Sequence, residues 1–246
     1  MDVKAVVVDW ARSPFHRAHK GSLGGMRPDD LAAHVIRELI SRNDIETSDF
    51  DDVLMGCGYP EAEQGYNIGR LVSFLAGFPD SVPGVTINRL CGSSMHAVLS
   101  AAANIESGWG DCYLCAGIES MSRVKRRGFN WSPHPGLELD WPEAYVTMGE
   151  TAENIADDWG VSRAEQEAFG LDSHIKANAA LEAGAFEDEI IPIIDGQDII
   201  ASDGCIRSDS TLEAMATLKP VFSENGTVTA ATSSPLTDGA VAMIVC

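Results

Sequence analysis

The sequence predicts an α/β fold: a mixed, mostly parallel sheet with helices on both faces, interrupted by an inserted loop domain. Over residues 1–120, short apolar segments rich in β-branched residues alternate with longer segments of helical periodicity. After Met121 the apolar period is lost, and basic residues, Trp, Pro and Gly gather in residues 123–142. A final apolar segment, Ala240–Val245, returns to the strand pattern. These observations indicate a sheet domain whose last strand follows an insertion.

The individual elements follow from local patterns in chain order. The segment Val3–Val8 is apolar without interruption, which is typical of a strand buried on both faces. Pro28 begins a helix whose apolar residues share one face. Ser162 and Glu165 form the capping box of a longer helix, which is expected to end before Gly184. The other predicted strands are 53–55, 85–87, 112–116 and 240–245, the other helices are 68–75, 95–105 and 150–159, and 195–209 is predicted as loop.

Composition and charge exclude several classes of protein. The 246 residues include 17 Lys and Arg against 37 Asp and Glu, for a formal net charge of −20. This charge argues against nucleic acid and anionic membranes as partners, and the 45% hydrophobic content argues against disorder. The N-terminus lacks a signal-peptide pattern, and no apolar run approaches the ~20 residues of a bilayer span. The sequence therefore predicts a cytoplasmic protein without membrane insertion.

The six cysteines are scattered irregularly, which predicts reduced thiols rather than a disulfide framework. Cys112 and Cys115 have the spacing of half a zinc site, but no second pair or set of histidines follows them. They lie in an apolar segment, so buried strand thiols are favoured and no metal site is predicted.

The turn around Cys91 is the most informative local feature. A predicted strand ends at Ile87, and a helix begins shortly after Cys91. A thiol presented there resembles a nucleophile elbow, because the unpaired N–H groups and dipole of a helix N-terminus favour a thiolate. The small residues 92–94 leave room for a substrate. An unreactive, buried cysteine explains the same pattern equally well.

A cysteine nucleophile also needs a base, and the histidines offer no clear one. They fall in predicted loops or helices, and His96 is too close to Cys91 in sequence to be placed within hydrogen-bonding reach. The six are His16, His19, His34, His96, His134 and His174.

Around this turn, and at intervals along the whole chain, the sequence resembles the thiolase family. The motifs, in the family's order, are Arg12-Ser-Pro14, Asn88-Arg-Leu-Cys-Gly-Ser-Ser-Met95, Ala116-Gly-Ile-Glu-Ser-Met121, Met148-Gly-Glu-Thr-Ala-Glu-Asn154, Ser162-Arg-Ala-Glu-Gln-Glu-Ala-Phe169, Thr211-Leu-Glu-Ala-Met215, Leu218-Lys-Pro220, Gly226-Thr-Val-Thr-Ala230 and Leu236-Thr-Asp-Gly-Ala240. The linker containing His134-Pro-Gly136 is more similar to degradative 3-ketoacyl-CoA thiolases than to biosynthetic acetoacetyl-CoA thiolases.

The resemblance implies a thiolase-like layered fold and an acyltransferase reaction in two steps. The thiolate of Cys91 would attack the ketone of a 3-ketoacyl-CoA and release acetyl-CoA, and free CoA would then accept the acyl group. Coenzyme A is thus implied as a co-substrate, with no covalently bound cofactor. The family's division implies a core domain at 1–120 and 237–246 and a loop domain at 121–236.

Further family residues belong to a C-terminal half that this sequence does not resemble: a His in Gly-His-Pro, an Asn in Asn-Glu-Ala-Phe and a Cys in Cys-x-Gly. The chain ends on an apolar strand, which is typical of a cut at a domain edge. We therefore expect the C-terminal twin domain to be absent, the chain to be the nucleophile-bearing half, and the isolated 246 residues to be inactive.

Binding residues carry over from the family one at a time. Arg207, Ser234 and Leu139 match positions that contact CoA, and Met148 and Leu90 match positions lining the acyl pocket. A solvated loop charge explains Arg207 equally well, and ordinary turn chemistry is the alternative for Ser234. Two departures are visible: Thr147 stands where biosynthetic members carry His, and residues 232–235 differ from the common Asn-Ala-Ser-Gly.

Thiolases pair through strands of the N-terminal core, so the resemblance implies a homodimer or larger assembly, and a separate C-terminal half is a possible partner. Acyl-CoA substrates are expected, and nucleic acid is not. The alternatives that remain open are a biosynthetic acetoacetyl-CoA thiolase, and a non-catalytic CoA- or acyl-binding module.

Overall fold

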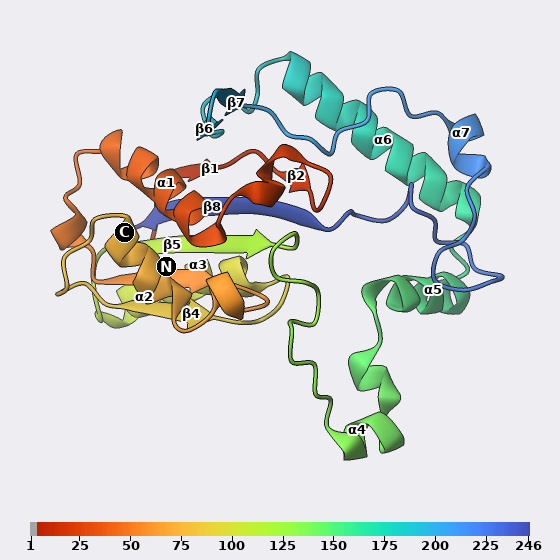
Figure 1. Cartoon of the computed structure of the whole chain (residues 1–246), viewed down its shortest axis with the longest axis horizontal. Helices are drawn as coiled ribbons and strands as arrows, with labels where there is room; N and C mark the ends of the chain where they lie inside the picture. Colours follow the sequence, from red (N-terminus) through yellow and green to blue (C-terminus); the bar gives the residue numbers. More distant parts are fainter. Residues whose placement is uncertain (1–3) are drawn as a thin grey trace. The chain divides into compact units, whose positions relative to one another are not determined.

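The computed structural model describes residues 4–246, which form two compact units (Figure 1). The first unit contains the chain up to Asn130, together with Glu187–Gly204 and Leu236–Cys246. The second contains Trp131–Phe186 and Cys205–Pro235. Residues 187–204, which the family pattern assigns to the loop domain, therefore belong to the first compact unit. No helix within residues 4–246 has the length and apolarity that a bilayer span requires.

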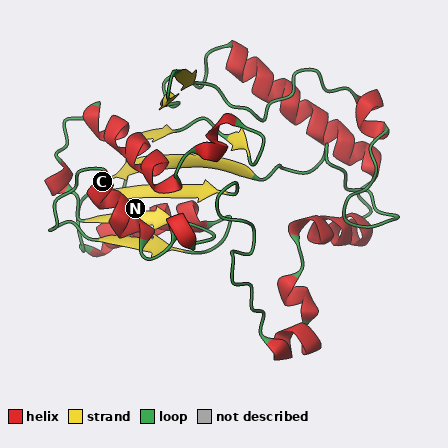
Figure 2. Cartoon of the chain, in the orientation of Figure 1, coloured by secondary structure: helices red, strands yellow, loops and turns green. Residues whose placement is uncertain are grey.

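The first unit is built on one sheet with the strand order β1-β8-β5-β3-β4, and β2 also pairs with β8 (Figure 2). Strand β3 runs parallel to β4 and β5, whereas β8 is antiparallel to β5, β1 and β2. Only β8 is reversed in this sheet, which confirms the prediction of a mixed, mostly parallel arrangement. The strands are β1 (Val7–Arg12), β2 (His16–Arg17), β3 (Asp52–Gly56), β4 (Gly84–Ile87), β5 (Tyr113–Ser120) and β8 (Thr237–Val245).

Helices cover both faces of this sheet. Because side chains alternate along a strand, Leu114 of β5 packs in the hydrophobic core with α1 and α2, whereas Cys115 packs with α3. In β8, Ile244 likewise packs on the α1 and α2 side of the sheet, and Val245 packs on the α3 side. The helices are α1 (Pro28–Ser41), α2 (Ile68–Leu75) and α3 (Ser93–Ser107), with short 3-10 turns at Ser22–Gly25, Thr47–Asp49 and Ala62–Gln64.

The first strand differs from its prediction. Val3 lies outside the described residues, and β1 begins at Val7 and extends to Arg12. Burial on both faces is wrong for this segment, because Val6, Val7 and Val8 are 53%, 46% and 45% exposed. The physical reason is position: β1 is an edge strand, paired with β8, while α3 packs mainly on β3 and β5. A run of valines cannot distinguish an edge strand from a central one.

An apolar groove of about 320 Å³ remains on the α3 face of the sheet. Val7 of β1, Met243 of β8 and Met95 of α3 line it. Met95 and Leu99 on α3 are 66% and 58% exposed. We call Val7, Met95, Leu99 and Met243 the exposed apolar face, which is the side of the sheet that α3 leaves partly uncovered.

The predicted loop at 195–209 begins as a hairpin, so that prediction is wrong for its first residues. Strands β6 (Ile193–Asp195) and β7 (Asp198–Ile200) pair antiparallel. Gly196 between them has φ +62°, which a two-residue turn accommodates without a Cβ penalty. Ile193 and Ile200 enter the core on the α1 side, which attaches this segment to the first unit.

The second unit is mainly helical. Its helices are α4 (Pro135–Asp140), α5 (Met148–Trp159), α6 (Arg163–Glu182) and α7 (Leu212–Ala216), with a 3-10 turn at Pro142–Tyr145. The predicted capping box is present: the Ser162 side chain accepts a hydrogen bond from the Glu165 N–H, and the Glu165 carboxylate accepts one from the Ser162 N–H at 2.8 Å. Gly184 follows α6 with φ +71°, as a helix-ending glycine does.

A buried carboxylate ties α5 to the segment after α7. Glu153 is 8% exposed, and its oxygens accept hydrogen bonds from the N–H groups of Thr227 (2.8 Å) and Val228 (3.0 Å). Burial alone raises the pKa of Glu153, but these hydrogen bonds outweigh it and hold the pKa below the usual 4.5. A carboxyl with a lowered pKa in the folded state stabilises that state above pH 4.5, and this contribution is lost as pH falls.

We therefore expect Glu153→Gln to destabilise the second unit by about 2–3 kcal/mol near neutral pH, because two buried N–H groups lose their charged acceptor. The difference from wild type should begin to shrink below pH 4.5, where the carboxyl of the unfolded chain takes up a proton, and should vanish only below the lowered pKa of the folded state. Urea unfolding at neutral pH and at about pH 4 measures both effects. The exposed Glu224→Gln is the matched control and should change stability by less than about 0.5 kcal/mol. Equal effects of the two variants would contradict the assignment.

Candidate active site

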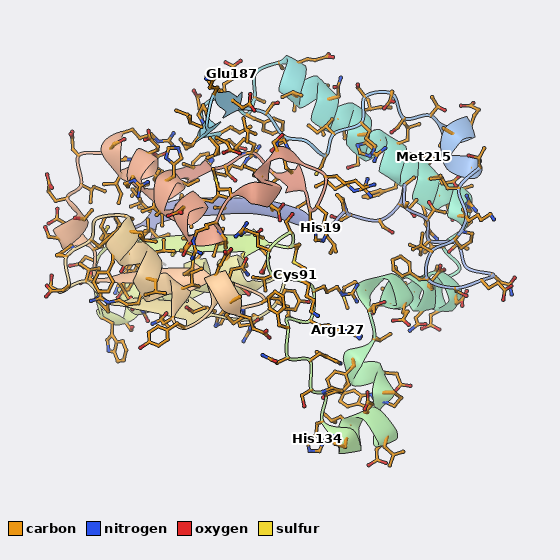
Figure 3. All side chains as sticks on the ribbon, viewed as in Figure 1. His19, Cys91, Arg127, His134, Glu187 and Met215 are labelled. Atoms are coloured by element: carbon orange, nitrogen blue, oxygen red, sulfur yellow. The ribbon has the colours of Figure 1, made fainter. Side chains whose placement is uncertain are left out.

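Cys91 lies in the turn that joins β4 to α3, at the edge of the sheet where the parallel strands β3, β4 and β5 end (Figure 3). It is the exposed cysteine among those of residues 4–246; the others are buried or half-buried. The helix begins two residues later at Ser93, with Gly92 as its N-cap. The predicted strand, turn and helix start are therefore present, and the thiol is accessible.

The backbone of this turn is held in an uncommon conformation. Leu90 has φ +46°, in the left-handed region that costs a residue with a Cβ about 1–2 kcal/mol. Two side chains stabilise it: Asn88 Oδ1 accepts from the Leu90 N–H at 2.9 Å, and Ser93 Oγ donates to the Leu90 carbonyl at 2.6 Å. Ser93 Oγ also accepts from the Arg89 N–H at 2.9 Å. Side-chain hydrogen bonds from residues before and after Leu90 thus hold this turn in its strained conformation, as is common at functional sites.

The first turn of α3 rests directly on two neighbouring glycines, which we call the glycine seat. Gly56 of β3 and Gly117 of β5 are partners in the parallel ladder. A Cβ placed on Gly56 would lie 2.5 Å from the Ser94 backbone nitrogen, and one on Gly117 would meet the Ser94 side chain. Because neither position carries a Cβ, the helix N-terminus packs close to the strand ends, and this position sets where Cys91 lies.

A hydrogen-bond network centred on Glu119 supports the Cys91 turn through Asn88. Glu119 accepts from the Gly58 N–H (2.7 Å) and from Gln64 Nε2 (2.6 Å). The Gly58 carbonyl accepts from Asn88 Nδ2 at 3.0 Å, which connects the network to the Cys91 turn. Burial raises the pKa of Glu119 above its usual value, although the bonds from Gln64 and Gly58 oppose the shift. Glu119 can therefore hold a proton closer to neutral pH than an ordinary carboxyl group.

The sequence reasoning assigned no role to Glu119, Gln64 or the glycine seat. Local signals for part of this arrangement exist, because Gly56 and Gly117 directly follow the predicted strands 53–55 and 112–116. A glycine at a strand end often marks a close approach of another backbone. Gln64 carried no such signal, since its partner Glu119 is distant in sequence.

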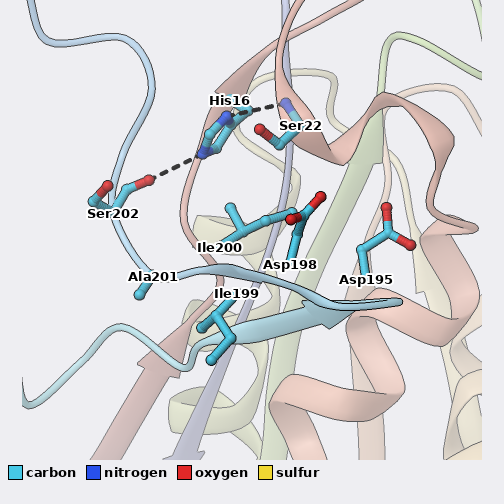
Figure 4. Close-up of a pocket in the computed structure, with 8 residues that line it drawn as sticks. All are labelled: His16, Ser22, Asp195, Asp198, Ile199, Ile200, Ala201 and Ser202. Atoms are coloured by element: carbon cyan, nitrogen blue, oxygen red, sulfur yellow. Dashed lines mark hydrogen bonds between the residues drawn. The ribbon is translucent and has the colours of Figure 1, made fainter.

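Two histidines of the first unit, His16 and His34, have ring contacts with residues other than Cys91. His16 lies in β2 rather than in a loop; its Nε2 contacts the Ser202 carbonyl at 2.9 Å, and its Nδ1 accepts from the Ser22 N–H at 3.2 Å. These residues line a hollow of about 510 Å³ that also includes Asp195 and Asp198, but not Cys91 (Figure 4). His34 Nε2 contacts the Pro192 carbonyl at 3.2 Å.

Cys112 and Cys115 are buried thiols, as the apolar pattern predicts, although the strand begins at Tyr113 rather than at Cys112. Cys115 lies within β5 and Cys112 directly precedes it, and they belong to the two different hydrophobic clusters on opposite faces of the sheet. Side chains on opposite faces cannot ligate one ion. Within residues 4–246 no group of three potential metal ligands is present.

The remaining candidates, except Leu90, lie in the second unit. Leu139 of α4 is 81% exposed, and Met148, the first residue of α5, is 67% exposed. Ser234 is exposed, with Oγ 3.5 Å from the Pro235 carbonyl, and the backbone N–H of exposed Arg207 donates to His174 Nδ1 at 3.2 Å. These four residues stand on separate segments of that unit. Thr147 stands at the position where biosynthetic thiolases carry His. Its side chain caps α5 by accepting a hydrogen bond from the Glu150 N–H.

Comparison with known proteins gives a consistent result. The family model described as "Thiolase, N-terminal domain" matches residues 5–246. A 3-ketoacyl-CoA thiolase of Bacillus subtilis is 40% identical over 255 aligned positions, covering 98% of this chain and 65% of that protein. 3-Ketoacyl-CoA thiolases of Shigella boydii and Escherichia coli are each 44% identical, with 98% of this chain and 64% of theirs covered. The chain thus spans somewhat less than two thirds of the length of these relatives.

Proposed function

This chain belongs to the thiolase family, and we propose on that premise that it carries the nucleophile of a degradative 3-ketoacyl-CoA thiolase. The observation that carries the proposal is Cys91, an exposed thiol in a locked turn at the N-terminus of α3. The relatives that match along 98% of the chain bear the name 3-ketoacyl-CoA thiolase, which favours this activity over the biosynthetic alternative and over a non-catalytic binding module.

In the proposed reaction the Cys91 Sγ thiolate attacks the C3 carbonyl carbon of a 3-ketoacyl-CoA, and a C–S bond forms. The bond between C2 and C3 then breaks; its electron pair stays on C2, which takes a proton as acetyl-CoA leaves. The thiolate of free CoA attacks the acyl thioester, and Cys91 is released with a shortened acyl-CoA. The N–H groups at the start of α3 supply fixed positive potential where negative charge develops on the substrate oxygen.

The base and second cysteine of this chemistry are, by family resemblance, outside the part of the relatives that this chain matches. The Glu119 network supports the turn but leaves the base unassigned. The proposal therefore assigns to these 246 residues the nucleophile, its positioning and part of the CoA site, and a homodimeric or larger assembly is proposed with it. The exposed apolar face, with Met95 66% exposed, favours such association because large uncovered apolar patches mark interaction surfaces.

The CoA and acyl contacts remain proposals at single positions. Arg207 is proposed near the adenosine end of CoA and Ser234 at the pantetheine arm. Leu139, Met148 and Leu90 are proposed as apolar walls, and their exposed side chains are available for that role. The division into a core at 1–120 and 237–246 and a loop domain at 121–236 is part of the same proposal, as are cytoplasmic location and fatty acid β-oxidation.

Cys91 is expected to be the first cysteine alkylated by iodoacetamide near neutral pH. It is exposed, whereas burial raises the pKa of Cys57 and Cys115 to about 12 and also raises the pKa of Cys112. Prior incubation with acetoacetyl-CoA should slow the alkylation, because an acyl thioester on Sγ blocks it. Peptide mass spectrometry of a time course measures both effects.

Two comparisons make this test specific. Incubation with acetyl-CoA, which lacks the 3-keto group, is the substrate control. Cys205→Ser, which removes a half-buried thiol of the second unit, is the variant control and should leave the labelling of Cys91 unchanged. Earlier labelling of a different cysteine would contradict the assignment of Cys91 as nucleophile.

A further inference from the structure

Two cysteines that the thiolase reaction does not use lie against each other at one end of the sheet. Cys112 directly precedes β5, and Cys246 directly follows β8. Their sulfur atoms are 2.8 Å apart, closer than the ~3.5–4.0 Å of ordinary non-bonded contacts. Both thiols are free in the structure.

The register of the strands explains this approach. Tyr113 of β5 is opposite Val245 of β8 in the antiparallel ladder, so the next pair outward is Cys112 and Cys246. The backbone N–H and C=O of Cys246 both bond to Val6, on the side away from β5. Those of Cys112 both bond to Asp51, again on the far side: its N–H to the side chain and its C=O to the backbone N–H. The two cysteines therefore form a non-hydrogen-bonded pair, whose Cα atoms are typically about 4.5 Å apart with side chains close together.

This geometry suits a covalent bond between the sulfurs. A disulfide requires Cα atoms about 4.4–6.8 Å apart and Cβ atoms that point to the same side. Directly opposite residues of an antiparallel ladder share a face, and both cysteines adjoin the hydrophobic core on the α1 side. Cys246 is half-buried, so a small oxidant can reach it, whereas Cys112 is buried.

We propose that Cys112 and Cys246 form a reversible disulfide, a redox modification site separate from the Cys91 centre. With hydrogen peroxide as oxidant, Cys246 Sγ attacks one peroxide oxygen, the O–O bond breaks, and a sulfenic acid and water result. Cys112 Sγ then attacks the Cys246 sulfur and displaces the hydroxyl as a second water. Two thiols lose two hydrogen atoms in total, and one peroxide becomes two waters. A dithiol reductant reverses the bond by exchange.

Cys112 is held as a protonated thiol by its surroundings. Burial, followed by Cys246 and the carboxylates of Asp51 and Asp49, raises the pKa of Cys112. A protonated thiol reacts slowly with peroxide, so Cys246 rather than Cys112 is expected to be oxidised first. Once formed, the bond joins the ends of a segment that contains the whole second unit, because residues 113–245 lie between the two cysteines.

The test is peroxide titration of the 246-residue protein, with alkylation of the remaining thiols, digestion by trypsin and chymotrypsin, and mass spectrometry. We expect a cross-linked peptide containing Cys112 and Cys246, two hydrogens lighter than the separate peptides and lost after dithiothreitol. The oxidised protein should melt on the order of 5–10 °C higher, since a cross-link over a long loop restricts the unfolded chain. Oxidation of Cys91 in the same sample shows that the peroxide dose was sufficient.

Cys246→Ser should abolish the cross-link, and the matched control Cys115→Ser, which removes a thiol on the opposite face of the sheet, should preserve it. The wild-type result alone decides the matter should a variant fold poorly. Recovery of Cys112 and Cys246 as separate alkylated peptides after Cys91 is oxidised would overturn the proposal. A cross-link between other cysteines would overturn it as well.

Discussion

The 246-residue polypeptide is expected to become acylated once on Cys91 by acetoacetyl-CoA and then to show no measurable turnover. By family resemblance, the base and the second cysteine are expected outside the part of the relatives that this chain matches. Loss of a general acid or base typically lowers a rate about 10²–10⁴-fold. This factor alone predicts a rate at least about 10²–10⁴-fold below that of a complete enzyme.

The measurement is loss of the ketoacyl-CoA absorbance, with the Bacillus subtilis relative as positive control, beside mass spectrometry of Cys91. Cys91→Ala should remove the acyl adduct while the fold persists, because an exposed side chain contributes little to stability. Robust turnover that Cys91→Ala abolishes would mean that one of the chain's own histidines acts as the base. Turnover that survives Cys91→Ala would remove the nucleophile assignment itself.

The second large effect is expected at the glycine seat. Gly56→Ala places a methyl group 2.5 Å from the Ser94 nitrogen, and because the obstacle is backbone, α3 must move. A displacement of about 1 Å at a reacting group can lower a rate about 10²-fold. We expect the acylation and alkylation of Cys91 to slow by this order, with a loss of stability of about 1–3 kcal/mol from overpacking.

Gly25→Ala is the matched control, because a Cβ at Gly25 meets nothing within 4 Å. Alkylation kinetics of Cys91 in both variants, measured well below their melting temperatures, separate displacement of the thiol from unfolding. A wild-type alkylation rate in folded Gly56→Ala would show that the position of Cys91 does not depend on the seat.

Elements with strong local signals were predicted well. Helix α2 has the predicted bounds, Ile68–Leu75, and α3 includes the whole predicted helix at 95–105. Helical periodicity and caps are properties of neighbouring residues, so they are readable without the fold. The burial of β1 was predicted wrongly because exposure depends on strand order, and the β6–β7 hairpin was missed because each strand has only three residues.

The same distinction applies to the candidate site. Cys91 and its turn were predictable because strand, turn and helix start are consecutive. The bond between Gln64 and Glu119 joins residues 55 positions apart, and the glycine seat joins β3 to β5 and to α3. These contacts join residues that come together only when the sheet forms, so patterns of neighbouring residues in one sequence do not reveal them.

The central place of β8 has a consequence for the order of folding during translation. Strand β1 pairs with β8, yet residues 13–236 are synthesised between them. After β5 leaves the ribosome, residues 121–236 delay β8 by about 6–23 s at ordinary elongation rates. During that interval β1 lacks the strand with which it forms its ladder, and one side of β5 is unpaired.

The second unit is in the opposite position, because its last residue, Pro235, is synthesised before β8 begins. The insertion can therefore complete its fold while its host domain is still open. Until β8 is made, Leu114 and Ala116 of β5 lack Ile244 and Ala242, the residues opposite them in the finished sheet. The unfinished chain therefore carries an unpaired edge of β5, and unpaired strand edges favour aggregation.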